Sequence, residues 1–377
     1  MYKRQELLAR QHYQTLTSLL LERGSPLRVG LLIGGQRVAE RRKLREQIES
    51  GEVHLVVGTQ AIICSEAAFA NLGLVVIDEQ HRFGVLQRSL LRQGTSDPHT
   101  LVMTATPIPR TVAHAVYGDL DISVIDELPP GRQEVATYRV SQDQVDQWWD
   151  FFRKKLKEGR QGYVVVPTVD VSGRDIASIS SAFESLANGH LEAFRLGLLH
   201  GRMKPEQKAS VMADFRANRF DVLVATSVIE VGIDVPNATL MTILDAENFG
   251  LAQLHQLRGR VARGRMQGIC GAVTNEEAKA SPRIDAFIST TDGFRLAEQD
   301  LILRGPGDIL GSRQSGSPPL YLADLLRDGE VASEARSDAK TIFESDPALG
   351  DERFSRLKKV LLGRWSATLN LGLEKVS

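Results

Sequence analysis

Short apolar runs alternate with amphipathic stretches along most of this sequence. Leucines recur near the helical period over residues 6–22, which predicts a first helix, and a second helix is expected over 36–50. Four apolar runs of strand length flank or follow that second helix, at 27–33, 53–57, 72–77 and 100–104. Strands that alternate with helices indicate a parallel sheet covered by helices.

The segment Glu-Leu-Pro-Pro-Gly-Arg at 127–132 breaks both periods and is typical of an interdomain linker. After it the alternation restarts. The expected strands are 135–140, 162–167, 194–199, 221–225, 238–244 and 268–273. The expected helices are 142–158, 173–187, 205–217 and 252–258. This second part predicts a complete α/β domain.

From about residue 282 the pattern changes to helices, interrupted by a Gly-rich segment at 304–311. We therefore expect an α/β protein with two parallel-sheet domains, residues 1–130 and 131–281, and a mainly helical region over 282–377. The net charge is −1, so binding to nucleic acid would have to come from local patches. The two cysteines lie far apart, and no apolar run approaches the roughly 18 residues of a membrane span, so a reduced cytoplasmic protein is expected.

Asp78, Glu79, Gln80 and His81 directly follow the apolar run Leu-Val-Val-Ile. A buried parallel strand delivers such residues to the carboxyl edge of its sheet, where nucleotides bind in α/β folds. One carboxylate can hold Mg²⁺ through water, and the next can orient an attacking water on a γ-phosphate. The alternative is a solvated strand end that carries acids by chance.

Other strand ends carry hydroxyl or basic residues: Thr59, Thr104 and Thr106, Arg202, and Thr226 with Ser227. Such side chains can bond a neighbouring acid or a nucleic-acid phosphate, contacts that position a strand without reading its sequence. Glu230 and Asp234 in the same turn as Thr226 can contact a nucleotide ribose or arginines. Each of these motifs taken singly also fits a structural turn.

Gln256, Arg258, Arg260 and Arg263 follow one another closely in Gln-Leu-Arg-Gly-Arg-Val-Ala-Arg-Gly. Arg263 lies three positions after Arg260, which predicts that they share a helical face. An arginine aimed at a γ-phosphate stabilises the charge of the transition state. A solvated basic helix end is the alternative.

Taken in order, these segments resemble the motor of a superfamily 2 helicase from its motif Ia onward. The resemblance sharpens to the RecG family of branch-migrating DNA helicases. It rests on DEQHRFGVLQ at 78–87, YGDLDISVIDELPPGR at 117–132 and DLILRGPGDILGSRQSG at 300–316, and it extends from about Glu6 to about Trp365. The last segment is similar to the family's TRG translocation motif. Transcription-repair coupling factors resemble the chain less closely.

The resemblance implies two RecA-like domains, ATP and Mg²⁺ as cofactors, and duplex or branched DNA, such as forks and Holliday junctions, as the partner. It also implies a monomer in the bacterial cytoplasm that associates with the nucleoid. Asp78 would hold Mg²⁺, Glu79 would activate water, and Gln80 and His81 would couple the nucleotide to the next motif. The residues implied at ATP are Gln256, Gly232, Asp234, Arg260 and Arg263. Those implied in DNA binding or coupling are Thr59, Thr104, Thr106, Arg202, Thr226, Ser227, Arg304 and Gln314.

The departure from the family is at the front. The Gly-Lys-Thr or Gly-Lys-Ser of a phosphate-binding loop occurs nowhere in the sequence, and that loop cradles the β- and γ-phosphates. We therefore expect a truncated first motor domain, with Met1–Gln5 foreign to the family, and little or no ATPase activity from this chain alone. The alternatives are an inactive or weakly DNA-binding fragment and the motor of a coupling factor.

Overall fold

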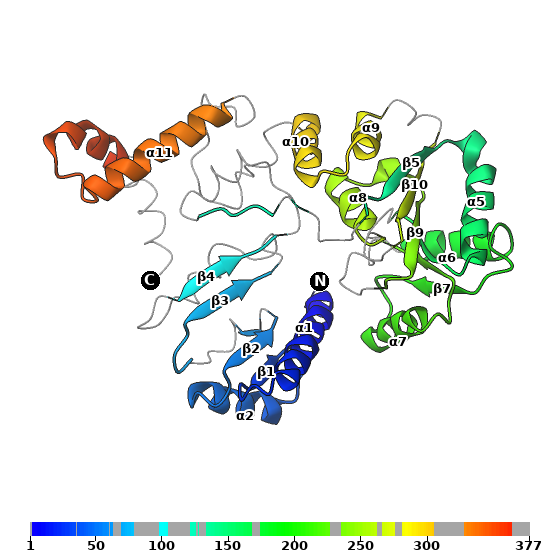
Figure 1. Cartoon of the computed structure of the whole chain (residues 1–377), viewed down its shortest axis with the longest axis horizontal. Coiled ribbons are helices and arrows are strands. Elements are labelled where there is room, and N and C mark those ends of the chain that lie inside the picture. Colours follow the sequence, from blue (N-terminus) through cyan, green and yellow to red (C-terminus); the bar gives the residue numbers. More distant parts are fainter. Residues whose placement is uncertain are drawn as a thin grey trace. The chain divides into compact units, whose positions relative to one another are not determined.

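The structure is a computed structural model, and it describes residues 2–34, 36–59, 61–62, 69–78, 98–104, 121–125, 127, 133–167, 174–226, 235–261, 266–275, 281–304 and 328–363 (Figure 1). The chain groups into two compact units. The first comprises residues 1–106 with 129–291, and the second comprises 107–128 with 292–377. The division into three domains at 130 and 281 stays a prediction.

Two pairs of parallel strands form the first part of the chain. Helix α1 (Tyr2–Glu22) leads to β1 (Val29–Leu32), and α2 (Val38–Glu49) leads from there to β2 (Leu55–Gly58). Strands β1 and β2 pair in parallel, with Leu32 opposite Gly58. Strands β3 (Leu74–Ile77) and β4 (His99–Val102) form a second parallel pair. All four expected strands are confirmed, and the first helix begins earlier than expected, at Tyr2.

Close approach of α2 to β1 depends on Gly30. A Cβ atom placed at Gly30 would lie 2.7 Å from Leu44 Cδ1, so a larger residue here would force the Leu44 side chain to shift. Strands β3 and β4 are more exposed to solvent. Leu74, Val76 and Leu101 are 60%, 52% and 51% exposed, although parallel strands are usually buried on both faces.

The second part of the chain forms one parallel sheet of six strands, in the order β5-β10-β9-β6-β8-β7. The strands are β5 (Ala136–Val140), β6 (Gln161–Val165), β7 (Leu196–Leu199), β8 (Val222–Ala225), β9 (Ala238–Ile243) and β10 (Ile269–Val273). The helices are η3 (Gln142–Gln144), α5 (Val145–Lys157), α6 (Arg174–Ala187), α7 (Pro205–Arg216), η5 (Ala246–Asn248), α8 (Leu251–Arg258) and α9 (Pro282–Ser289). All six expected strands are confirmed to within two residues. This α/β architecture confirms the expected fold class.

Aromatic residues of α5 fill the core beneath this sheet. Trp148, Trp149 and Phe152 are 8%, 2% and 0% exposed. The Trp148 indole Nε1 donates a hydrogen bond to Thr242 Oγ1 at 3.0 Å, so its one polar atom is satisfied inside the core. Helix α5 is thereby fixed against β9, which lies at the centre of the sheet.

The second unit contains α10 (Gly293–Arg304), α11 (Gly329–Ser345), η7 (Glu352–Phe354) and a helical segment at 355–363. The expected helical character of this region is confirmed for these residues. Residues 128–132 of the expected linker at 127–132, and residues 305–311 of the Gly-rich segment at 304–311, lie outside the described residues. No helix in the described part of the chain is long and apolar enough to cross a membrane.

Candidate nucleotide and DNA site

Asp78 leaves the carboxyl end of β3, where the sequence places the first acid of the candidate site. Ile77 lies opposite Val102 in the parallel ladder, and the Met103 N–H donates to the Ile77 carbonyl at 2.8 Å. Asp78 and Thr104 therefore leave the same edge of the β3–β4 pair. The side chain of Asp78 is 47% exposed, so its carboxylate is accessible to a cation.

His12 of α1 also lies at this edge, and no sequence motif pointed to it. Its Nε2 atom is 3.8 Å from Asp78 Oδ2, and the imidazole is 56% exposed. Glu79, Gln80, His81 and Thr106 lie outside the described residues, so their predicted roles stay predictions.

Thr59 follows β2 at the carboxyl edge of the β1–β2 pair. Its N–H donates to the Leu32 carbonyl at 3.3 Å, and its hydroxyl oxygen accepts from the Ala61 N–H at 3.3 Å. These two bonds fix the turn after β2. The hydroxyl therefore has a defined position at an edge that can receive a phosphate.

The carboxyl edge of the six-stranded sheet carries Thr226 and Arg202. Leu199 lies opposite Ala225, so both residues follow neighbouring strand ends. Thr226 is 5% exposed, and its N–H donates to the Leu199 carbonyl at 3.3 Å. Arg202 is exposed in the turn after β7. Ser227, Gly232 and Asp234 lie outside the described residues.

His200 stands beside Arg202 in that turn. Burial, with further contributions from Lys208 and Arg202, lowers the pKa of the His200 imidazole. Its Nδ1 atom is buried and has no hydrogen-bond partner within the described residues. Burial and the two cationic neighbours therefore both disfavour protonation of this ring.

The arginines after Gln256 separate into two environments. Helix α8 ends at Arg258, and Gly259 and Arg260 form a turn beyond it. The prediction that Arg260 lies on a helical face is therefore wrong, because the helix stops two residues earlier. Gln256 and Arg260 are half-buried. Arg263 lies outside the described residues, as does Gln314, and Arg304 is the last residue of α10.

Arg258 has a structural position that the sequence did not reveal. It is 3% exposed, and its Nη1 donates to the carbonyls of Phe287 and Thr290, each at 2.8 Å. Its guanidinium lies 4.7 Å from the centre of the Phe287 ring. Burial lowers the pKa of Arg258. The side chain thus satisfies carbonyls at the end of α9 and joins that helix to α8.

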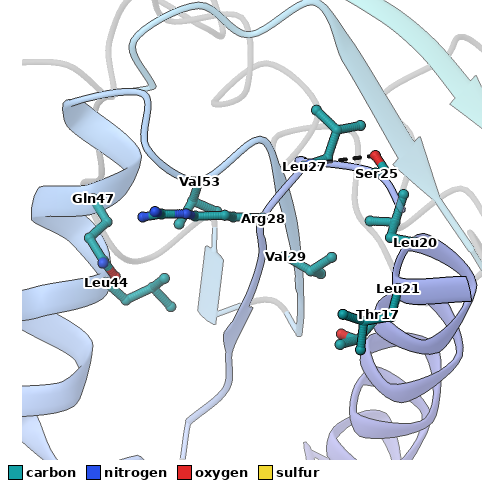
Figure 2. A pocket seen from close by; sticks show the side chains of 10 residues that line it. All are labelled: Thr17, Leu20, Leu21, Ser25, Leu27, Arg28, Val29, Leu44, Gln47 and Val53. Carbon is teal, nitrogen blue, oxygen red and sulfur yellow. Dashed lines mark hydrogen bonds between the residues drawn. The ribbon is translucent and has the colours of Figure 1, made fainter. Parts of the chain in front are cut away.

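A cavity of about 320 Å³ lies elsewhere, between α1, α2 and the start of β1 (Figure 2). Its lining residues are Thr17, Leu20, Leu21, Ser25, Leu27, Arg28, Val29, Leu44, Gln47 and Val53. Leu27 and Arg28 precede β1 and Val53 precedes β2, so the cavity opens at the amino ends of these strands. Thr59 is at the opposite ends, and none of the predicted site residues lines this cavity. The cavity is therefore separate from the candidate site.

The residues that the structure describes fit Mg²⁺ held in part by a nucleotide. They contain no group of three or more His, Cys, Asp or Glu that could form a metal cage. Mg²⁺ is commonly held by one or two carboxylates together with water and phosphate oxygens. The exposed carboxylate of Asp78 is a ligand of this kind.

Three protein families match successive parts of the chain. Residues 5–115 match the DEAD/DEAH box helicase family, and residues 144–265 match the helicase conserved C-terminal domain. Residues 290–363 match the C-terminal part of domain 3 of the ATP-dependent DNA helicase RecG. These matches follow, in order, the two strand pairs of the first part, the six-stranded sheet and the helical region.

Curated relatives match nearly the whole chain. The ATP-dependent DNA helicase RecG of Synechocystis is 46% identical over 97% of this chain and 44% of its own length. The RecG of Bacillus subtilis is 43% identical over 95% of this chain and 52% of its own length. The chain thus spans about half the length of the relatives that it matches.

Solved structures show the same fold. A structure of RecG bound to a three-way DNA junction matches with a TM-score of 0.65 and 43% identity, covering 86% of this chain and 42% of that one. The DUF1998 helicase MrfA, solved with DNA and AMPPNP, matches with a TM-score of 0.58 but 16% identity, which shows the fold alone. With this degree of identity to curated relatives along nearly all of its length, the chain belongs to the RecG family of superfamily 2 helicases.

Proposed function

We propose that this chain forms the motor of an ATP-dependent DNA helicase that remodels branched DNA, such as stalled forks and Holliday junctions, and acts as a monomer. The observation that carries the proposal is the exposed carboxylate of Asp78 at the carboxyl end of β3, beside Thr104. A hydrolytic nucleotide site needs an acid at this position. The relatives described above are RecG helicases, which favours this function over the motor of a coupling factor.

In the proposed site, ATP and Mg²⁺ supply the phosphoryl group and its charge neutralisation. Asp78 would hold Mg²⁺ through water, and Glu79 would orient the attacking water. From the part of the chain that forms the six-stranded sheet, the nucleotide would be contacted by Gln256, Gly232, Asp234, Arg260 and Arg263. Arginine there would stabilise the charge that develops on the γ-phosphate.

DNA would be held mainly through its phosphates. Thr59, Thr104 and Thr226 each follow the end of a parallel strand, where a hydroxyl can donate to a phosphate oxygen. Thr106, Arg202 and Ser227 would add to these contacts, and Gln80 and His81 would couple them to the nucleotide. Arg304 and Gln314 would couple closure of the motor to the DNA duplex. Binding dominated by phosphates should weaken steeply as salt is raised.

The test uses a chimaera in which the upstream half of the Synechocystis relative is joined to this chain at Glu6. We expect junction-stimulated ATP hydrolysis from the chimaera and very little from residues 1–377 alone. Glu79→Gln in the chimaera should lower turnover by about 100-fold or more without weakening DNA binding. Glu192→Gln, on the exposed surface near the end of α6, is the matched control and should leave turnover unchanged.

Two results would contradict the proposal. One is a folded chimaera that binds junctions but does not hydrolyse ATP. The other is a Glu79→Gln chimaera that turns over as fast as the unsubstituted one.

A further inference from the structure

Helix α2 carries a row of arginines that none of the motifs above uses. Arg37 is the residue that precedes the helix, and Arg41 and Arg45 follow at intervals of four. Residues four apart lie on one face of a helix, separated by about 6 Å along its axis. The row is therefore about 12 Å long.

The same face of α2 becomes apolar toward the end of the helix. Ile48 is 2% exposed, and Leu44 packs against Gly30 in β1, as shown by the 2.7 Å between Leu44 Cδ1 and a Cβ built on that glycine. Since β1 and β2 are parallel, α2 must run back between them in the opposite direction. Its last turns therefore lie over the amino end of β1, and Arg37 and Arg41 lie toward the carboxyl end.

Within the described part of the chain, the side chains of Arg37, Arg41 and Arg45 make no hydrogen bond or ion pair. The Nε atoms of Arg41 and Arg45 are buried without a hydrogen-bond partner. Arg42, which points to another face, behaves differently, because its Nε is paired with Glu46 Oε1 at 3.1 Å. Repulsion between like charges four residues apart is unfavourable, and so are buried N–H groups without an acceptor. An anion bound to the row would relieve both.

The turn that leads into the row is fixed in position. Gln36 Nε2 donates to the Leu31 carbonyl at 2.7 Å, and the Ile33 N–H donates to Gln36 Oε1 at 3.1 Å. The neighbouring strand β2 ends at Gly58, opposite Leu32, and Thr59 follows it. The start of the arginine row and the Thr59 hydroxyl therefore share the carboxyl edge of the β1–β2 pair.

We propose that Arg37, Arg41 and Arg45 bind the phosphate backbone of DNA and extend the edge marked by Thr59. Phosphates along one DNA strand are spaced about 3.4 Å along the helix axis, so a row of about 12 Å can meet several of them. Guanidinium groups match phosphate oxygens in a bidentate geometry. The contact is independent of base sequence, because it reaches only the backbone. This inference rests on the proposed function, since it requires that the chain binds DNA.

The experiment measures binding of residues 1–377 to a fluorescent three-way junction of arbitrary sequence, by anisotropy, over a range of salt concentrations. In the triple variant Arg37→Gln, Arg41→Gln, Arg45→Gln, we expect affinity to fall by about tenfold or more. The slope of log K against log salt should become shallower by about 2 to 3, because each phosphate contact contributes about 0.9. Arg42→Gln is the matched control on the same helix and should change neither quantity.

Two further variants separate charge from folding. Replacing all three arginines by lysine should keep most of the salt slope, whereas Arg37→Gln alone, at the exposed start of the row, should reduce it by about 1. Circular dichroism checks that each variant is folded. If the slope of log K against log salt decreases as much in the triple lysine variant as in the triple glutamine variant, the proposal is overturned.

The outcomes for the row and for the proposed function are distinguishable. If the unsubstituted chain binds the junction and the folded glutamine variant binds it equally well with the same salt slope, the row is not a DNA contact, while the proposed function stands. If the unsubstituted chain does not bind DNA even at low salt, both proposals fail.

Discussion

Replacement of Arg258 by methionine should destabilise the six-stranded part of the protein. The guanidinium is 3% exposed and donates to two carbonyls at the end of α9. Methionine fills much of the same volume but leaves those carbonyls without a donor. A hydrogen bond from a charged group contributes about 1.5–3 kcal/mol, so the loss of both, offset in part by the apolar replacement, should cost about 3 kcal/mol.

Urea unfolding followed by tryptophan fluorescence measures this loss. Trp148 and Trp149 are buried against the same six-stranded sheet, and a Trp365→Phe background removes the remaining tryptophan. With a slope of about 2 kcal/mol per M, a loss of about 3 kcal/mol lowers the midpoint by about 1.5 M. Arg258→Lys keeps the charge but only part of the hydrogen-bonding fork, so its midpoint should lie between those of the wild type and Arg258→Met.

Arg219→Met is the matched control. Arg219 pairs with Asp214 at 3.0 Å, but its side chain is 71% exposed, so the change should stay within about 0.5 kcal/mol. If the midpoint of Arg258→Met shifts by no more than that of this control, Arg258 does not hold α9 in place and the reasoning is refuted.

Three other outcomes are expected. Arg195 lowers the pKa of the Asp221 carboxyl by hydrogen bonding, so Asp221→Asn should lower the Tm at neutral pH. This difference should begin to shrink as pH falls below about 4 and vanish only below the lowered pKa of Asp221. Equal Tm values at pH 7 would contradict this. Burial raises the pKa of Cys270 to about 12. In a Cys64→Ser background, iodoacetamide at about pH 8 should therefore label Cys270 only as fast as the protein unfolds. Rapid labelling of the folded chain would refute this. Val76 is 52% exposed and Ile77 is 6% exposed. Val76→Thr should therefore change the unfolding free energy by less than about 0.5 kcal/mol, whereas Ile77→Thr should lower it by about 2 kcal/mol or more. Hydrogen exchange of strand β3 measures both changes.

The sequence by itself determined the elements of this protein and the order of its motifs. Every expected strand is present, because each is a short apolar run whose period and boundaries are local properties of the chain. The placement of Asp78 at a strand end follows from the same local signal. Glu79 and Arg263 stay predictions, since they lie outside the described residues.

Tertiary structure decided which strands pair and what each arginine does. Strand β9 lies between β6 and β10, an order that depends on hydrogen bonds between segments distant in sequence. Arg258 and Arg260 look equivalent in the sequence, yet Arg258 is buried against Phe287 and Thr290, whereas Arg260 follows the end of the helix. Arg41 and Arg42 differ in the same way, since among the described residues Arg42 has an acidic partner on its face and Arg41 has none. A local pattern specifies that a residue is charged, whereas its partners come from other elements and exist only once the chain has folded.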